Sequence, residues 1–234
     1  QCLAGVGPDL FDCYDGFQLA AYVRSGMALD CTEELARRGI DIDSVWPCLR
    51  PLIVHEGRVY GHPGNANAPA LWYNKTLFDA AAEPYPRGDW TWEEFIAVAQ
   101  RLTRYDNRGR PTQFGVLMGP TDWYDVFIGK WGARLYTPEG TRCTLDSPEA
   151  AAAAQFYQDL IYKHAVMPSP TEELAMASTG GWGTSPIHLF GAGRAAMAVG
   201  GRWWLCILRT KDYASLRLGA VELLSKREWL IAVG

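Results

Sequence analysis

Apolar residues recur along this chain with two spacings, and each spacing predicts one kind of secondary structure. Positions 150, 153, 156, 157, 160 and 161 lie on one face of a helix that is predicted to run from Pro148 to about Lys163. Short apolar runs bounded by turn residues predict strands at 53–55, 58–60, 70–73, 114–118, 195–199 and 218–223. Because helices and strands alternate, the predicted fold class is α/β.

Polar residues mark where several of the helices begin. Thr91, followed three residues later by Glu94, forms a capping box and predicts a helix from Trp92 to Leu102. The segment Asp146-Ser147-Pro148-Glu149 offers a cap, a proline at the first helical position and an acid in the first turn. Thr32 is expected to cap a short helix that ends at Gly39.

Turn residues locate two further features near the start of the chain. Glu56-Gly57 separates two strand-like runs by two residues, which predicts a β-hairpin. The turn at Gly7-Pro8 is expected to lead into a short strand that includes Leu10 and Phe11.

The composition is that of a globular protein. Hydrophobic residues make up 48% and charged residues 21% of the 234 residues, which suffices to bury a core. The formal net charge of -4 gives no electrostatic reason to expect nucleic acid as a partner. No apolar run approaches the roughly 20 residues of a membrane-spanning helix, and residues 1–7 do not resemble a signal peptide, which a mature chain would also lack.

The cysteines and histidines show no pattern typical of a metal site. None of the six cysteines forms a CxxC pair, and the histidines at 55, 62, 164 and 188 are scattered. We interpret the cysteines as small buried apolar thiols; in an exported protein, some of Cys2, Cys13, Cys31 and Cys48 could instead form disulfides. The turn that begins at Asp106 has arginines where calcium ligands should stand, so no metal and no cofactor is expected.

No motif in the sequence indicates catalysis. Gly191-Ala-Gly-Arg-Ala-Ala196 matches a dinucleotide-binding pattern, but a helix precedes it and a strand follows, which is the wrong order. Pairs of acids such as Glu93 and Glu94 lie at helix starts, where they stabilise the helix dipole. Ser185 lacks the glycine context of a nucleophile elbow. We therefore expect a binding protein rather than an enzyme.

Aromatic residues supply the positive signal for function. The chain carries 10 tryptophans and 11 tyrosines, and many lie beside glycine or in predicted loops: Tyr14, Trp123, Tyr124, Trp131, Trp182, Trp203 and Trp204. An aromatic ring can stack on the C–H face of a sugar while nearby polar groups bind the hydroxyls. Tryptophans also fill hydrophobic cores, but Trp203 follows a Gly-Gly pair at a strand end and is the favoured binding residue.

Six stretches, in order, resemble the extracytoplasmic sugar-binding proteins of ABC importers, the group that includes maltose-binding protein. They are GVGPDLF at 5–11, SGMALDCT at 25–32, GRVYGHP at 57–63, LWYNKTLF at 71–78, DWTWEEF at 89–95, and FGAGRAAM at 190–197 followed by GGRW at 200–203. Together they span most of the chain.

The resemblance implies a type II periplasmic-binding-protein-like fold of two α/β lobes joined by crossing strands. Residues 1–70 would be part of lobe one, with 223–234 returning toward it, and residues 71–222 would form lobe two. The opening strand–helix–strand unit of the family and the segment after the return crossing have no counterpart, so lobe one is expected to be incomplete.

The resemblance also implies which residues contact a solute in the cleft between the lobes. They are Asp12, Tyr14, Asp15 and Phe17 after the Pro-Asp motif, Asn67 before the crossing strand, Asp122, Trp123 and Tyr124 in a lobe-two loop, and Arg202 with Trp203 in the last motif.

The implied function is to bind a mono- or oligosaccharide outside the cytoplasm and to deliver it, as a monomer, to the membrane permease subunits of an ABC importer. Closure of the hinge would favour the solute-bound state. Three alternatives stay open: a binder of glycerol-3-phosphate-type solutes, which Arg202 would favour; a carbohydrate-active hydrolase that uses a carboxylate such as Asp15 or Asp122; and a chain with no working site.

Overall fold

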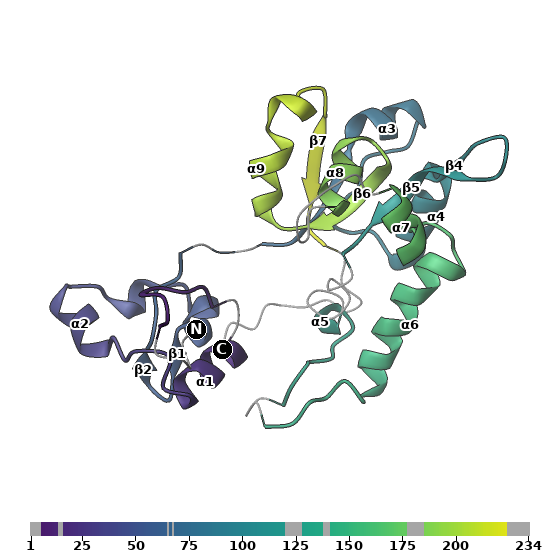
Figure 1. The fold of residues 1–234 in the computed structure, drawn as a ribbon. Helices are drawn as coiled ribbons and strands as arrows, with labels where there is room; N and C mark the ends of the chain where they lie inside the picture. Colours follow the sequence, from purple (N-terminus) through teal and green to yellow (C-terminus); the bar gives the residue numbers. More distant parts are fainter. Residues whose placement is uncertain are drawn as a thin grey trace. The chain divides into compact units, whose positions relative to one another are not determined.

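The computed structural model describes residues 6–13, 16–64, 66, 68–119, 128–137, 141–176 and 185–223 (Figure 1). The chain divides into two compact units between Ala66 and Asn67. Each unit is described by itself.

The first unit contains two helices and one β-hairpin. The helices are α1 (Gly16–Arg24) and α2 (Thr32–Arg37), and two 3₁₀ helices, η2 (Ile42–Ser44) and η3 (Pro47–Leu52), follow them. Strands β1 (Val54–His55) and β2 (Arg58–Val59) pair in antiparallel fashion. Glu56 and Gly57 both have positive φ, 49° and 76°, as a two-residue type I′ turn requires. The predicted hairpin is confirmed.

A cluster around Asp30 fastens the segment before α2 to strand β2. The Asp30 carboxylate accepts hydrogen bonds from the Thr32 hydroxyl at 2.6 Å and the Thr32 backbone N–H at 3.0 Å, and it contacts the Arg58 guanidinium. The Val59 N–H donates to the Thr32 hydroxyl at 2.9 Å. These bonds, led by that of the Thr32 side chain, lower the pKa of Asp30 to about 2.

Two predictions for this unit are wrong. Thr32 does not cap α2 but is its first residue, because its hydroxyl is taken up by Asp30 and Val59. No strand forms between residues 6 and 13, and Leu10 is 89% exposed. A strand needs a hydrogen-bonded neighbour, and within the described residues of this unit β1 and β2 pair only with each other.

The second unit is built on a five-stranded sheet with the order β4-β5-β6-β3-β7. Strands β5 and β6 are parallel, and every other neighbouring pair is antiparallel. The strands are β3 (Ala70–Asn74), β4 (Arg104–Tyr105), β5 (Pro111–Leu117), β6 (Ala195–Gly200) and β7 (Leu218–Val221). All except β4 were predicted, with small differences in their ends.

Helices cover both faces of this sheet (Figure 1). Leu71 and Tyr73 of β3 pack in one hydrophobic cluster with α4 and α6, whereas Trp72 packs in a second cluster with α8 and α9. Burial on both faces explains why β6 is a continuous apolar run. The helices are α3 (Lys75–Ala80), α4 (Trp92–Leu102), α5 (Ile128–Lys130), α6 (Pro148–Tyr162), α7 (Pro170–Met176), α8 (Ser185–Gly191) and α9 (Leu205–Leu208).

The helix starts follow the predicted capping chemistry. The Glu94 N–H donates to the Thr91 hydroxyl at 3.1 Å, and the Thr91 N–H donates to the Glu94 carboxylate at 2.8 Å. Ser147 caps α6, with its hydroxyl 3.2 Å from the Ala150 nitrogen. Asn74 caps helix α3, since its side chain accepts from the Thr76 N–H at 3.0 Å.

The prediction of buried thiols is wrong for the described cysteines, of which Cys13 and Cys31 are half-buried and the other three are exposed. Cys48 and Cys206 lie in short helices and Cys143 lies in an isolated β-bridge with Tyr136, and all three are exposed. The thiols of Cys31 and Cys48 are free, so neither takes part in the disulfides considered for an exported protein. Among the described residues, no helix is long and apolar enough to cross a membrane.

The capping box of α4 gives a test of the fold. Replacing Thr91 by alanine removes the acceptor of the Glu94 N–H and should lower the free energy of unfolding by about 1 kcal/mol. Thr210 occupies the same position before the 3₁₀ helix η6 (Lys211–Tyr213) but makes no side-chain capping bond, so Thr210→Ala is the matched control. If urea denaturation gives equal losses in the free energy of unfolding for both variants, Thr91 does not act as the cap of α4.

Candidate functional site

Four strand ends meet at one edge of the second unit's sheet. Leu117 near the end of β5 pairs with Ala198, and Gly200 at the end of β6 pairs with Ala70 at the beginning of β3. Val221, which ends β7, pairs with Leu71. The edge therefore joins the carboxyl ends of β5, β6 and β7 to the start of β3, and we call it the carboxyl edge. In open α/β sheets, ligands bind at this kind of edge.

Three of the predicted ligand segments are attached to the carboxyl edge. Arg202 and Trp203 begin the 3₁₀ helix η5 (Arg202–Trp204) directly after β6. Asn67 stands three residues before β3, and Asp122 stands five residues after β5. The topology thus brings together chain segments that are more than 50 residues apart in the sequence. Asn67 itself, and Asp122, Trp123 and Tyr124, lie outside the described residues.

The other predicted residues belong to the first unit. Asp12 lies exposed ahead of α1. Tyr14, Asp15 and the side chain of Phe17 lie outside the part of the chain that the structure describes. Their roles therefore stay predictions.

A pair of tryptophans fixes the backbone where β6 ends. The Trp72 indole N–H donates to the Gly200 carbonyl at 2.8 Å in a buried hydrogen bond. The Trp204 ring lies so close to Gly200 that a Cβ there would stand 2.4 Å from the indole. Only glycine accepts this approach, which explains the glycine at position 200.

Trp203 is the exposed partner of this arrangement. Its indole is 46% exposed, whereas that of Trp204 is buried, and the two rings meet edge to face with centroids 6.4 Å apart. Because Trp204 is anchored, η5 holds Trp203 outward at the carboxyl edge. This is the geometry that an aromatic stacking platform requires.

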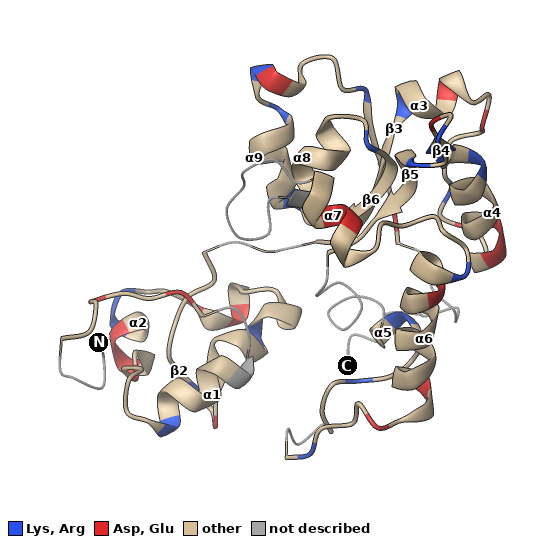
Figure 2. Cartoon of the chain, turned by 45° about the vertical axis from the view of Figure 1, so that its right-hand side comes forward, with Lys and Arg blue, Asp and Glu red and all other residues tan. Residues whose placement is uncertain are grey.

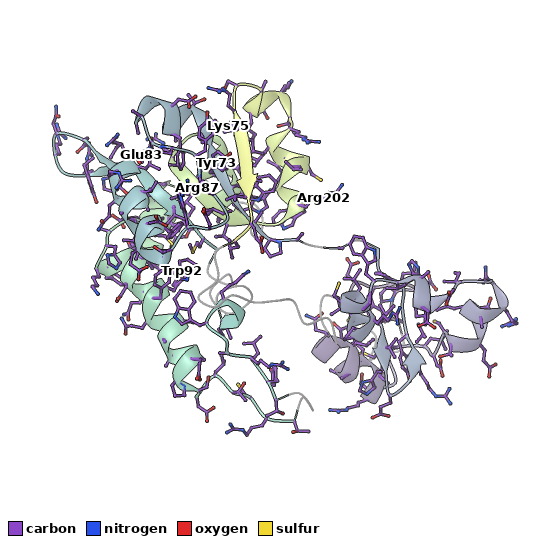
Figure 3. All side chains as sticks on the ribbon, turned by 180° about the vertical axis from the view of Figure 1, so that it is seen from behind. Tyr73, Lys75, Glu83, Arg87, Trp92 and Arg202 are labelled. Atoms are coloured by element: carbon purple, nitrogen blue, oxygen red, sulfur yellow. The ribbon has the colours of Figure 1, made fainter. Side chains whose placement is uncertain are left out.

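Arg202 stands beside this platform. It is exposed, and it forms no ion pair with any described residue. Its side chain projects outward from the unit (Figure 3). An uncompensated guanidinium beside an aromatic ring can bind hydroxyl, carboxylate or phosphate oxygens.

Two of the aromatic candidates prove to be core residues. Trp131 and Trp204 are both buried, and Trp131 packs against Trp92 with ring centroids 4.9 Å apart. Sequence reasoning also missed two side chains that hold backbone near the carboxyl edge. Lys130 donates to the Leu223 carbonyl at 3.3 Å, and the Tyr157 hydroxyl donates to the Gly119 carbonyl at 3.3 Å. No motif marks Lys130, and the spacing of Tyr157 indicates only that it belongs to the apolar face of α6.

The contact between Gly200 and Trp204 gives a test of this local structure. Gly200→Ala forces a methyl group into a buried indole and should cost about 1–3 kcal/mol of stability. Gly88→Ala is the matched control, because a Cβ at Gly88 meets nothing within 4 Å. Thermal or urea unfolding checks this, and the added variant Trp204→Phe should recover part of the loss. Equal stability of the two alanine variants would contradict the close packing of Trp204 against Gly200.

Comparison with known proteins finds relatives both in sequence and in structure. An arabinooligosaccharide-binding protein of Halalkalibacterium halodurans is 27% identical over 118 residues, which are 49% of this chain and 25% of that protein. The structure resembles an ABC substrate-binding protein from Listeria monocytogenes in complex with cycloalternan, with a TM-score of 0.72 and 24% identity. It also resembles UgpB from Mycobacterium tuberculosis in complex with glycerophosphocholine, with a TM-score of 0.70 and 21% identity.

These likenesses establish the fold and its extent. The chain has the fold of the type II periplasmic binding proteins, as expected. The match covers 87% of this chain and 49% of the Listeria protein, and 95% of this chain and 52% of UgpB. The chain thus spans about half the length of these solved relatives. The model of the bacterial extracellular solute-binding protein family matches residues 1–213, and the chain belongs to this family.

Proposed function

We propose that the chain forms the ligand-contacting part of a binding protein that takes up a mono- or oligosaccharide and delivers it to an ABC importer. The observation that carries this proposal is the exposed Trp203 indole, which the buried Trp204 holds at the carboxyl edge. A sugar ring would stack on Trp203, and its hydroxyls would be bound by polar groups of the neighbouring segments.

The relatives support a carbohydrate as the solute. The Halalkalibacterium protein is described as binding arabinooligosaccharides, and the Listeria protein was solved with cycloalternan. Family membership supports an extracytoplasmic location and a binding role without catalysis. On this proposal, Asp122, Trp123 and Tyr124 contact the solute from the second lobe, Asp12, Tyr14, Asp15 and Phe17 contact it from the first, and Asn67 contacts it from the end of the first lobe, just before the crossing strand.

The proposed mechanism is a shift between open and closed states. A solute that touches both lobes binds the closed state more tightly, so the closed population rises as the site fills. The permease subunits would recognise the closed monomer, and no bond in the sugar is made or broken. Lobe one would comprise residues 1–70 and 223–234, and lobe two residues 71–222.

Removal of the platform tests the proposal. Trp203→Ala should weaken binding of the cognate sugar about fivefold, because stacking on an aromatic face contributes on the order of 1 kcal/mol. Calorimetric titration with a panel of mono- and oligosaccharides measures this. Trp46→Ala is the control: it removes an indole that is 66% exposed on the first unit and should leave affinity unchanged.

Three results would count against the proposal. Equal affinity of the Trp203→Ala and wild-type chains would show that the sugar does not stack on Trp203. Recovery of a cleaved sugar after incubation would assign a hydrolase. If the folded chain binds no sugar and a chain extended to the full length of its relatives also binds none, the solute is not a carbohydrate.

A solute bearing a phosphate diester is the second candidate. Two observations favour it: the exposed Arg202 without an acidic partner among the described residues, and the likeness to UgpB solved with glycerophosphocholine. A guanidinium binds phosphate oxygens through two parallel hydrogen bonds, which a neutral sugar does not offer.

Substitution at Arg202 separates the two candidates. If the solute bears a phosphate, Arg202→Gln should weaken its binding ten- to a hundredfold, since a charge-assisted hydrogen bond contributes about 1.5–3 kcal/mol. Arg209→Gln, an exposed arginine just after α9, is the matched control. Titration with glycerophosphocholine and glycerol 3-phosphate measures this, and equal affinities of both variants would exclude the phosphate assignment.

A further inference from the structure

The hairpin formed by β4 and β5 carries a concentration of positive charge. It extends away from the rest of its unit (Figure 1), and Lys and Arg segments gather around β4 in Figure 2. We call residues 101–113 together with Arg194 the arginine hairpin. Arg194 belongs to it because its guanidinium donates to the Thr112 carbonyl at 3.3 Å. Its exposed arginines are Arg101, Arg104, Arg108, Arg110 and Arg194.

Two of these arginines are neutralised by acids. Arg101 donates to both carboxylate oxygens of Glu83, one of them at 2.9 Å. Arg110 pairs with Asp106 at 2.8 Å. Asp106 has no capacity left for another arginine, because it also accepts the backbone N–H groups of Arg108 and Arg110, and these bonds lower its pKa.

Three arginines keep an uncompensated charge. Arg104 donates to the Arg101 carbonyl at 2.9 Å and lies near Glu83 only, an acid that Arg101 already pairs with, and Arg194 donates to the Thr112 carbonyl. The Arg108 side chain forms no ion pair with any described residue. A carbonyl positions a guanidinium but does not cancel its charge, and the hairpin therefore carries an excess of three positive charges.

An exposed tyrosine belongs to the hairpin, and a second one is close in sequence to the residue that it contacts. Tyr105, in β4 itself, is 53% exposed, and its hydroxyl donates to the Ala165 carbonyl at 3.3 Å. Tyr162, three residues before Ala165 in the sequence, is 67% exposed. Aromatic rings with a polar tip, next to arginines, are typical of surfaces that meet the headgroup region of a bilayer.

We propose that the arginine hairpin docks on a bilayer surface that contains anionic phospholipids. Arginine matches phosphate geometry through paired hydrogen bonds, and exposed tyrosine tolerates the boundary between water and headgroup. The net charge of the whole chain is -4, so the attraction comes from the local charge of this hairpin and not from the charge of the chain as a whole.

Docking at the hairpin leaves the carboxyl edge free. The turn of the hairpin, which carries Arg108 and Arg110, precedes β5, the carboxyl edge follows it, and β5 has seven residues. At roughly 3.3 Å per residue, the two regions are about 20 Å apart along the strand.

Protection of a sheet edge does not account for this charge. β4 is an edge strand, and arginine on such a strand discourages pairing with other chains. That role requires a charge on β4, which Arg104 provides. Arg108 lies in the turn and Arg194 precedes the central strand β6, so neither protects the edge.

Co-sedimentation with phospholipid vesicles tests the proposal. The complete chain should bind vesicles of phosphatidylglycerol and phosphatidylcholine but not vesicles of phosphatidylcholine alone, and 0.5 M salt should release it, at roughly three times physiological ionic strength. The triple variant Arg104→Gln, Arg108→Gln, Arg194→Gln should partition about a hundredfold less, since each cation near an anionic surface contributes about fivefold.

A matched triple variant controls for net charge. Arg37, Arg38 and Arg142 are exposed and paired with acids, so their replacement by glutamine changes the net charge equally without touching the hairpin. Circular dichroism verifies that both variants fold. Equal losses for the two triple variants, or no preference of the wild-type chain for anionic vesicles, would overturn the proposal. Retention on immobilised poly-glutamate without binding to anionic vesicles would also overturn it and assign an acidic protein partner.

Discussion

The close approach of Trp204 to Gly200 is the constraint on which the candidate site depends. It is possible only because Gly200 lacks a Cβ, and the buried hydrogen bond from Trp72 holds the same glycine from the neighbouring strand. With the end of β6 fixed in this way, the chain turns directly into η5. Trp203, which directly precedes Trp204 in η5, is thereby held with its indole toward solvent.

Much of the second unit could be predicted because its local chemistry agrees with its tertiary structure. The capping box at Thr91 and the Ser147-Pro148 start follow from short-range hydrogen bonding and from the fixed φ of proline. The apolar run of β6 is long enough to indicate a strand buried on both faces. In each case, the residues that decide the outcome lie within a few positions of one another.

The failures occur where distant residues decide. The Thr32 hydroxyl would cap a helix in isolation, but Asp30 and Val59 bind it instead. The apolar residues at 10–11 resemble a strand, yet no neighbouring strand is present among the described residues to pair with them. For the site, the motif after β6 indicated that Trp203 is exposed, but sequence could not show that Trp131 is buried against Trp92 or that Lys130 holds the Leu223 carbonyl.

The pairing of β3 with β6 has a consequence for how the second unit folds. Ala70 and Gly200 are neighbours in the sheet although 130 residues separate them, and β5 contacts β6 across some 80 residues. Contacts this distant in sequence carry a large loop-closure cost and are formed late. On a ribosome, the capping box of α4 and the hairpin that follows it can form early, but the central strand is among the last parts of the unit to be synthesised. Until β6 is synthesised, β3 and β5 lack the strand that lies between them in the sheet. The unfinished unit therefore exposes apolar surface, and is prone to aggregate, for most of its synthesis.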